Sequence, residues 1–219
     1  MTLHPDAQGE NAIAVLRQFA RRRSAAERCE MCSRELFPEH DHLVEPASHS
    51  LVCACEACAV LFDGQRGARY KRVPRTAYLL ADFRMSDSQW ESLMIPIEMA
   101  FFFFSSPQGK VIAMYPSPAG AVESLLPLET WDEIVLANPV LREMEADVMG
   151  LLANRVRSNG PPHTAEYYLV PIDQCYKVVG LIRSHWRGLS GGTEVWREIG
   201  TFFAELGKRA KTRCETGHV

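Results

Sequence analysis

The stretches CEMC at residues 29–32 and CACEAC at residues 53–58 hold five of the seven cysteines of this 219-residue chain. Each stretch contains a Cys-x-x-Cys pair, and a tight turn brings the two thiols of such a pair to one point. The segment between the pairs is long enough for a short hairpin that returns the second pair to the first. The spacing therefore predicts one tetrahedral metal site built from two distant turns.

The simplest ligand set uses both pairs, and consists of Cys29, Cys32, Cys55 and Cys58. Cys53 is an alternate ligand that can replace one member of the second pair, because residues two apart share a face in an extended strand. His40 and His42 are weaker candidates, since four thiolates already complete a structural zinc shell. We expect His42 to donate a hydrogen bond to a ligand sulfur instead.

Zinc is the metal expected for a closed shell of four thiolates, and iron is the alternative because tetrahedral sulfur also suits an iron centre. The second pair reads CEACA at residues 55–59 and lacks the proline and glycine typical of rubredoxin-like iron sites. The sequence therefore favours zinc in a segment too small to be stable without a metal.

Composition narrows the class of protein. The net charge of −3 and a pI near 6.2 argue against binding to nucleic acid through bulk electrostatics. The longest apolar run, residues 94–104, is too short for a membrane span and contains Glu98. The first residues show no secretion signal. We therefore expect a cytoplasmic protein, in which clustered cysteines bind metal more often than they form disulfides.

The expected fold class is α+β, with four segments along the chain. A zinc-ribbon-like module precedes a mixed α/β domain that has a central antiparallel hairpin. The expected segments are an N-terminal helix in residues 1–27, the metal-binding module in 28–66, the α+β domain in 67–209 and a flexible tail in 210–219.

Hydrophobic periodicity and capping patterns predict the elements of the larger domain. The hairpin is expected at 95–104 and 110–115, where four consecutive phenylalanines indicate a strand covered on both faces. A further strand is expected at 166–170, and the stretch 146–156 is compatible with either helix or strand. Helices are expected to begin at Ser86, at Ser117–Gly120, at Thr130, at Asp173 and at Thr193.

No catalytic constellation is evident, so an enzyme is less favoured than a binding protein. Cys175 lies on the apolar stripe of the helix expected from Asp173 and is interpreted as a small core residue. Cys53, if it is not a metal ligand, is the other candidate nucleophile, and it would need an accessible thiol with a lowered pKa.

Beyond the cysteines, the sequence contains YPSPAG at 115–120, LLPL at 125–128, NP at 138–139, VPID at 170–173 and GLIR at 180–183. With these motifs the chain resembles a bacterial family of unknown function that is often encoded beside nickel–iron hydrogenase genes. The resemblance implies an accessory protein whose partner is a hydrogenase subunit or maturation factor. A rubredoxin-like iron protein transferring electrons in the same system is the alternative. The resemblance supplies no catalytic residues.

Overall fold

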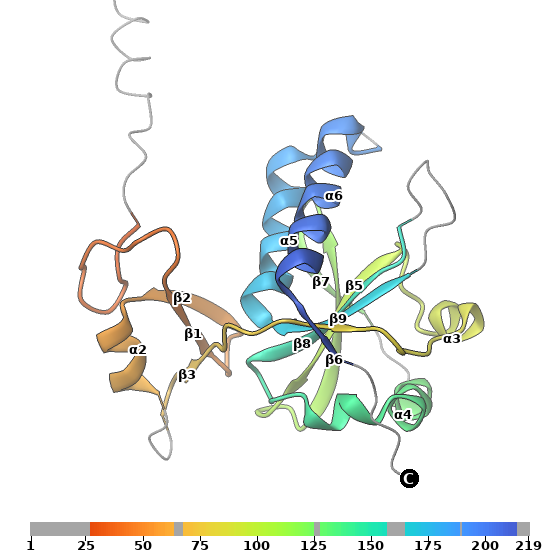
Figure 1. Ribbon diagram of the computed structural model, residues 1–219, viewed down its shortest axis with the longest axis horizontal. Helices are drawn as coiled ribbons and strands as arrows, with labels where there is room; N and C mark the ends of the chain where they lie inside the picture. Colours follow the sequence, from red (N-terminus) through yellow and green to blue (C-terminus); the bar gives the residue numbers. More distant parts are fainter. Residues whose placement is uncertain (1–26, 64–67, 125–127, 157–164, 189, 214–219) are drawn as a thin grey trace, which may run out of the picture.

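The structure is a computed structural model that describes residues 27–63, 68–124, 128–156, 165–188 and 190–213 (Figure 1). It contains two sheets, a small one near the start of the described chain and a larger one formed by the rest. The helix expected within residues 1–27 lies almost entirely outside the described residues. Helices and mixed sheets together make the fold α+β, as predicted.

The small sheet has three antiparallel strands in the order β2-β1-β3. Its elements are β1 (Asp41–Glu45), β2 (Ser50–Ala54), the helix α2 (Glu56–Phe62) and β3 (Lys71–Arg72). The hairpin of β1 and β2 is the one predicted between the cysteine pairs. Among the described residues, the apolar side chains other than thiols that are fully buried in its core are Leu43, Ala54 and Ala59. So small a core contributes little stability by itself.

The larger sheet has seven strands in the order β10-β4-β9-β8-β5-β6-β7, and every pair is antiparallel except β10 with β4. The strands are β4 (Tyr78–Leu80), β5 (Met99–Ser105), β6 (Lys110–Ser117), β7 (Gly120–Ser124), β8 (Met149–Asn154), β9 (Glu166–Pro171) and β10 (Lys211–Arg213). The predicted hairpin is β5–β6. The ambiguous stretch 146–156 contains the strand β8, which pairs with β5 on one side and with β9 on the other, and all six of its residues are buried.

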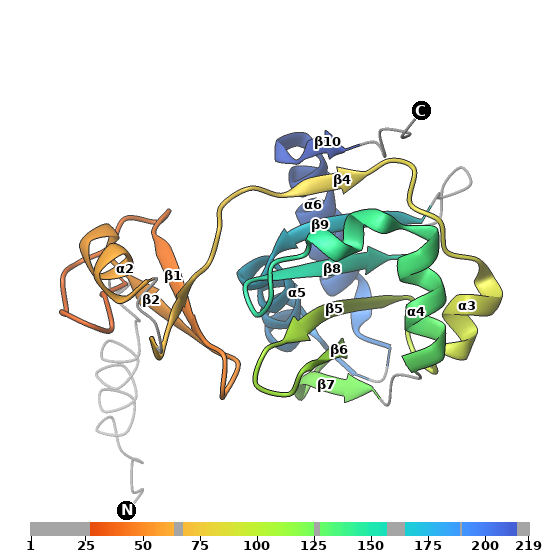
Figure 2. The same ribbon diagram turned by 90° about the horizontal axis from the view of Figure 1, so that it is seen from below.

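Helices cover both faces of the larger sheet (Figure 2). They are α3 (Asp87–Ser92), α4 (Leu128–Ala137), the 3-10 helix η1 (Pro139–Glu143), α5 (Ile172–His185) and α6 (Gly192–Arg209). On one face Phe101 meets Tyr176 of α5 edge-on, and on the other Phe102 stacks on Trp131 of α4. The row of phenylalanines therefore supplies side chains to both layers, as the sequence predicted.

Several expected boundaries are wrong. The residues after Ser117 form a turn and the strand β7 instead of a helix, because Gly120 has φ of 132° and the chain folds back to pair with β6. The helices α4, α5 and α6 begin before the predicted caps, and α5 starts directly where β9 ends. The capping box of Ser86 and Gln89 is confirmed. Within the expected tail, Lys211–Arg213 form β10 because they pair with β4.

Polar contacts connect the small sheet to the larger one. The strand β3 lies beyond residue 66, so the small sheet takes its third strand from the segment assigned to the large domain. Lys71 on β3 reaches across to Asp147, with 2.6 Å between Nζ and Oδ2. His49 lies 3.3 Å from the hydroxyl of Ser105 and meets Phe103 edge-on. These contacts fix the position of the cysteine-bearing module against β5.

Candidate metal centre

Four thiols from two separated turns converge at one end of the small sheet. They belong to Cys29, Cys32, Cys55 and Cys58, and their sulfur atoms all lie within 4.8 Å of one another. The Cys32 and Cys55 sulfurs are 3.7 Å apart, far longer than a disulfide bond. Zinc–sulfur bonds of about 2.3 Å in a regular tetrahedron would place neighbouring sulfurs about 3.8 Å apart. The group therefore has the dimensions needed to hold one metal ion.

The backbone explains why these thiols meet. Ser33, with φ of 62°, closes the first turn through a hydrogen bond of 2.7 Å from its N–H to the Cys29 carbonyl. The Glu30 N–H donates to the Cys53 carbonyl at 2.9 Å, which ties this turn to the end of β2. Cys55 is the N-cap of α2, so Cys58 falls on the same face of its first turn. The second cysteine pair therefore lies at the start of a helix, whereas a ribbon built from two turns would have a second loop there.

The thiols have opposed electrostatic environments. Burial raises the pKa of Cys29, but backbone N–H groups of Cys55, Cys32 and Met31 outweigh it and lower the pKa to about 6. Burial, the hydrogen bonds that the protonated Cys58 thiol donates to the neighbouring sulfurs, and the Cys29 charge raise the pKa of Cys58 to about 12. Without a cation, therefore, Cys29 forms a thiolate readily and Cys58 stays protonated. A bound metal ion would supply the positive charge that lets all four ionise together.

Cys53 does not join this group. Cys53 lies opposite His42 in the β1–β2 register. The Cys53 sulfur and one ring nitrogen each from His40 and His42 lie within 4.8 Å of one another. The expected bond from His42 to a ligand sulfur is replaced by a contact of 3.1 Å between His42 Nδ1 and Asp173 Oδ2. Cys53, the alternate ligand, and His42, the expected hydrogen-bond donor to a ligand sulfur, therefore lie together at a position separate from the four-cysteine group.

The two candidate nucleophiles lack the environment that activates a thiol. Burial, together with the charges of Glu27, Glu30 and Cys29, raises the pKa of Cys53. Cys175 is fully buried on α5, and burial raises its pKa well above the usual value. Both shifts oppose formation of a reactive thiolate at neutral pH. Cys175 is a core residue, as its place on the apolar stripe indicated.

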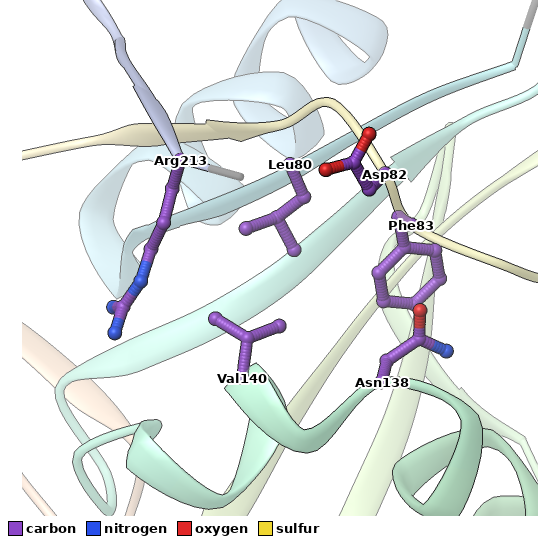
Figure 3. A pocket seen from close by; sticks show the side chains of 6 residues that line it. All are labelled: Leu80, Asp82, Phe83, Asn138, Val140 and Arg213. Carbon is purple, nitrogen blue, oxygen red and sulfur yellow. The ribbon is translucent and has the colours of Figure 1, made fainter. Parts of the chain in front are cut away.

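The structure shows other hollows that the sequence did not reveal. A mostly apolar cavity of about 480 Å³ lies at one end of β5 and β6, lined by Tyr115, Trp186 and Trp196 among others. The pocket in Figure 3 lies where Leu80 and Val140 face each other beside Phe83, and its volume is about 10 Å³. That volume is at the lower limit for a single water molecule, so this pocket is a packing gap.

The geometry thus defines a protein with a group of four cysteines able to hold a metal ion, on a small sheet docked against a seven-stranded one. Residues 28–210 match the model of the family of unknown function DUF5947, and the chain belongs to that family. Comparison with curated proteins and with solved structures gives no match. None of the helices in the described ranges is long and apolar enough to cross a membrane.

Proposed function

We propose that this protein is a non-enzymatic accessory protein in which Cys29, Cys32, Cys55 and Cys58 hold a structural zinc ion. The observation that carries the proposal is the convergence of these four sulfurs within 4.8 Å of one another, with the Cys32 and Cys55 sulfurs 3.7 Å apart, close to the edge of a zinc tetrahedron. A cytoplasmic location suits it, because reduced thiols are required and the described cysteines are free.

The role of the ion follows from the size of the module. Few apolar residues are buried in its core, and the loop between residues 29 and 40 adds only the partly buried Met31 and Leu36, so apolar burial stabilises this loop weakly. Structural zinc sites supply about 10–16 kcal/mol of apparent binding free energy near neutral pH, which becomes folding free energy for the segment they bind. Metal loading would therefore fix the surface that the module displays.

That surface carries apolar side chains suited to a partner. Phe37, in the loop before β1, is 83% exposed, and Val60 on α2 is 60% exposed. Exposed apolar side chains mark a protein interaction site where they form a contiguous patch. The resemblance to proteins encoded beside hydrogenase genes suggests a nickel–iron hydrogenase subunit or maturation factor as the partner.

A pull-down with the tagged full-length protein tests this partner. We expect hydrogenase components to be recovered with the wild type and to be reduced several-fold with Val60→Glu. The matched control is Leu136→Glu, because Leu136 is 68% exposed on α4 of the other module. Repeated recovery of no hydrogenase component, or equal loss with both variants, would contradict the proposed docking.

Electron transfer by bound iron is the second candidate, and the exposure of Cys32 favours it, because a solvent-facing thiolate is a route for electrons. Colour separates the two. A zinc protein is colourless, whereas an iron–thiolate protein absorbs visible light. We expect freshly purified protein to be colourless and to contain zinc. A visible absorption band, together with iron found by elemental analysis, would mean that the four cysteines hold iron instead of zinc.

A further inference from the structure

The group of His40, His42 and Cys53 lies on the face of the β1–β2 hairpin that meets α5. His42 and Cys53 are directly opposed in the strand register, and His40 precedes His42 by two residues, so the chain can present all three on one side. One potential ligand atom of each residue lies within 4.8 Å of the other two. Two imidazoles and a thiol are therefore gathered at a second position, and a metal ion bound there would displace the thiol proton.

Hydrogen bonds leave the same nitrogen available on both imidazoles. His40 Nδ1 lies 2.9 Å from the Phe37 carbonyl, which can only accept, so Nδ1 carries the proton. His42 Nδ1 lies 3.1 Å from the Asp173 carboxylate, which fixes its proton in the same way. In the neutral rings, Nε2 then has a free lone pair. A carboxylate holding the remote nitrogen of a metal-ligating histidine is a common arrangement in metal sites.

Unsatisfied polar atoms point to the same place. Across the part of the chain that the structure describes, two buried side-chain nitrogen or oxygen atoms lack a hydrogen-bond partner, His40 Nε2 and Asp173 Oδ1. The His40 side chain is only 6% exposed. Such orphaned atoms are rare and call for a water molecule or an ion. Both residues line one open cavity of about 660 Å³, together with His42 and Cys53.

We propose that His40, His42 and Cys53 form a second metal site, which holds a divalent ion of the zinc class with its fourth position open to this cavity. Two imidazoles and one thiolate suit zinc and its neighbours among the transition metals. Three protein ligands with a free position are typical of sites that accept a further ligand, in contrast to a closed shell of four thiolates. Asp173 is a positioning residue that orients His42.

The cavity leaves the fourth position open to a small ligand. Its lining carries both signs of charge, with the positive Lys177 of α5 and Arg209 of α6 and the negative Glu27 and Glu39. A small ligand such as azide can therefore be used to probe the open position. The cavity thereby joins both modules of the protein at the proposed ion, since His42 comes from the small sheet and Asp173 from α5. This site goes beyond the proposed structural zinc ion and does not depend on it.

Cobalt(II) is the probe, because thiolate-bound cobalt gives a near-ultraviolet charge-transfer band and visible bands. The full-length protein, freed of exchangeable metal and kept reduced, is titrated with cobalt. We expect two bound ions for the wild type and one for Cys53→Ala or for His40→Ala. The control His185→Ala removes a histidine whose Nδ1 faces the Leu181 carbonyl on α5, and it should bind two. The bands of the four-cysteine site, unchanged in these variants, show that the module is folded.

Two further measurements sharpen the test. Asp173→Asn should weaken the second ion about tenfold, at the lower end of the effect of removing such a partner, without changing the first. Azide should shift the visible bands of the second ion and leave those of the first unaltered. A single cobalt ion in the wild type, with bands that persist in Cys53→Ala, would overturn the second site. No response to azide would overturn its open position.

Failure of the proposed structural site gives a different result. If the four cysteines bind no metal, the wild type and Cys58→Ala would each bind one cobalt ion. The absorption bands of that ion would then be absent in Cys53→Ala. The two proposals are therefore separable in one set of titrations.

Discussion

Replacing Lys71 with methionine tests how the small sheet is fastened to the larger one. The Asp147 carboxylate is 1% exposed and accepts from Lys71 Nζ at 2.6 Å, and from the Ser106 N–H and hydroxyl at 2.7 and 2.6 Å. Lys71→Met leaves this charge buried with two of its three donors. Removing one partner of a buried pair costs about 3–5 kcal/mol. Because Lys71 is 40% exposed and partly screened, we expect a loss of about 2 kcal/mol.

Asp147→Asn is the matched control. It removes the charge that needs Lys71 and keeps an acceptor for Ser106, and asparagine tolerates the φ of 70° at this position. Lys71 can then turn to solvent, so the expected cost is only about 1 kcal/mol. The assay is urea unfolding followed by circular dichroism and by fluorescence of the four tryptophans, all of which lie in the larger domain.

The pH dependence adds a second readout. Burial alone would raise the pKa of Asp147, but the bonds from Lys71 and Ser106 outweigh it and hold the pKa below its ordinary value of 3.8. The stability due to this pair is therefore present above that pH and is lost as the pH falls through the lower folded pKa. The difference in the free energy of unfolding between the wild type and Lys71→Met should become smaller below about pH 4. If Asp147→Asn proves as costly as Lys71→Met at neutral pH, the reasoning is refuted.

Three further substitutions have defined outcomes in the same unfolding assay. Cys175→Ala should keep full metal content and cost about 1 kcal/mol, as for a small core residue; loss of metal would contradict its assignment. Asn138→Ala removes a buried amide that bonds the backbone of Arg84, and should cost about 2–3 kcal/mol; a neutral effect would show that water replaces it. Gly191→Ala should cost at least about 1–2 kcal/mol, because φ is 86° and a Cβ would come within 3.0 Å of Trp186; unchanged stability would mean that the turn relaxes.

The four-cysteine group was predictable because its signal is local. Turn spacing sets which thiols of a pair meet, and the length between pairs permits the hairpin that joins them. The phenylalanine row likewise predicted a strand buried on both faces, since alternation sends Phe101 and Phe102 to opposite layers. In both features the pattern itself is short, since each cysteine pair spans four residues and so does the row of phenylalanines.

The position of Cys53 was not decided by spacing alone. Residues 53 and 55 share a face only while the strand continues, but β2 ends at Ala54 and Cys55 already caps α2. The hairpin register then pairs Cys53 with His42. The motif His40-x-His42 was a local signal for this face, whereas Asp173 comes from α5, and only the docking of the two modules brings it there. The strand β10 was missed for a similar reason, because its partner β4 is distant in the chain.

The most direct test of the account is the metal content of Cys53→Ala protein, in which only the four-cysteine group can bind. The account predicts one zinc ion per chain after purification without added metal, and loss of that ion when Cys58 is also replaced by alanine. A metal-to-protein ratio near zero, with the remaining thiols freely titratable in the folded protein, would contradict it.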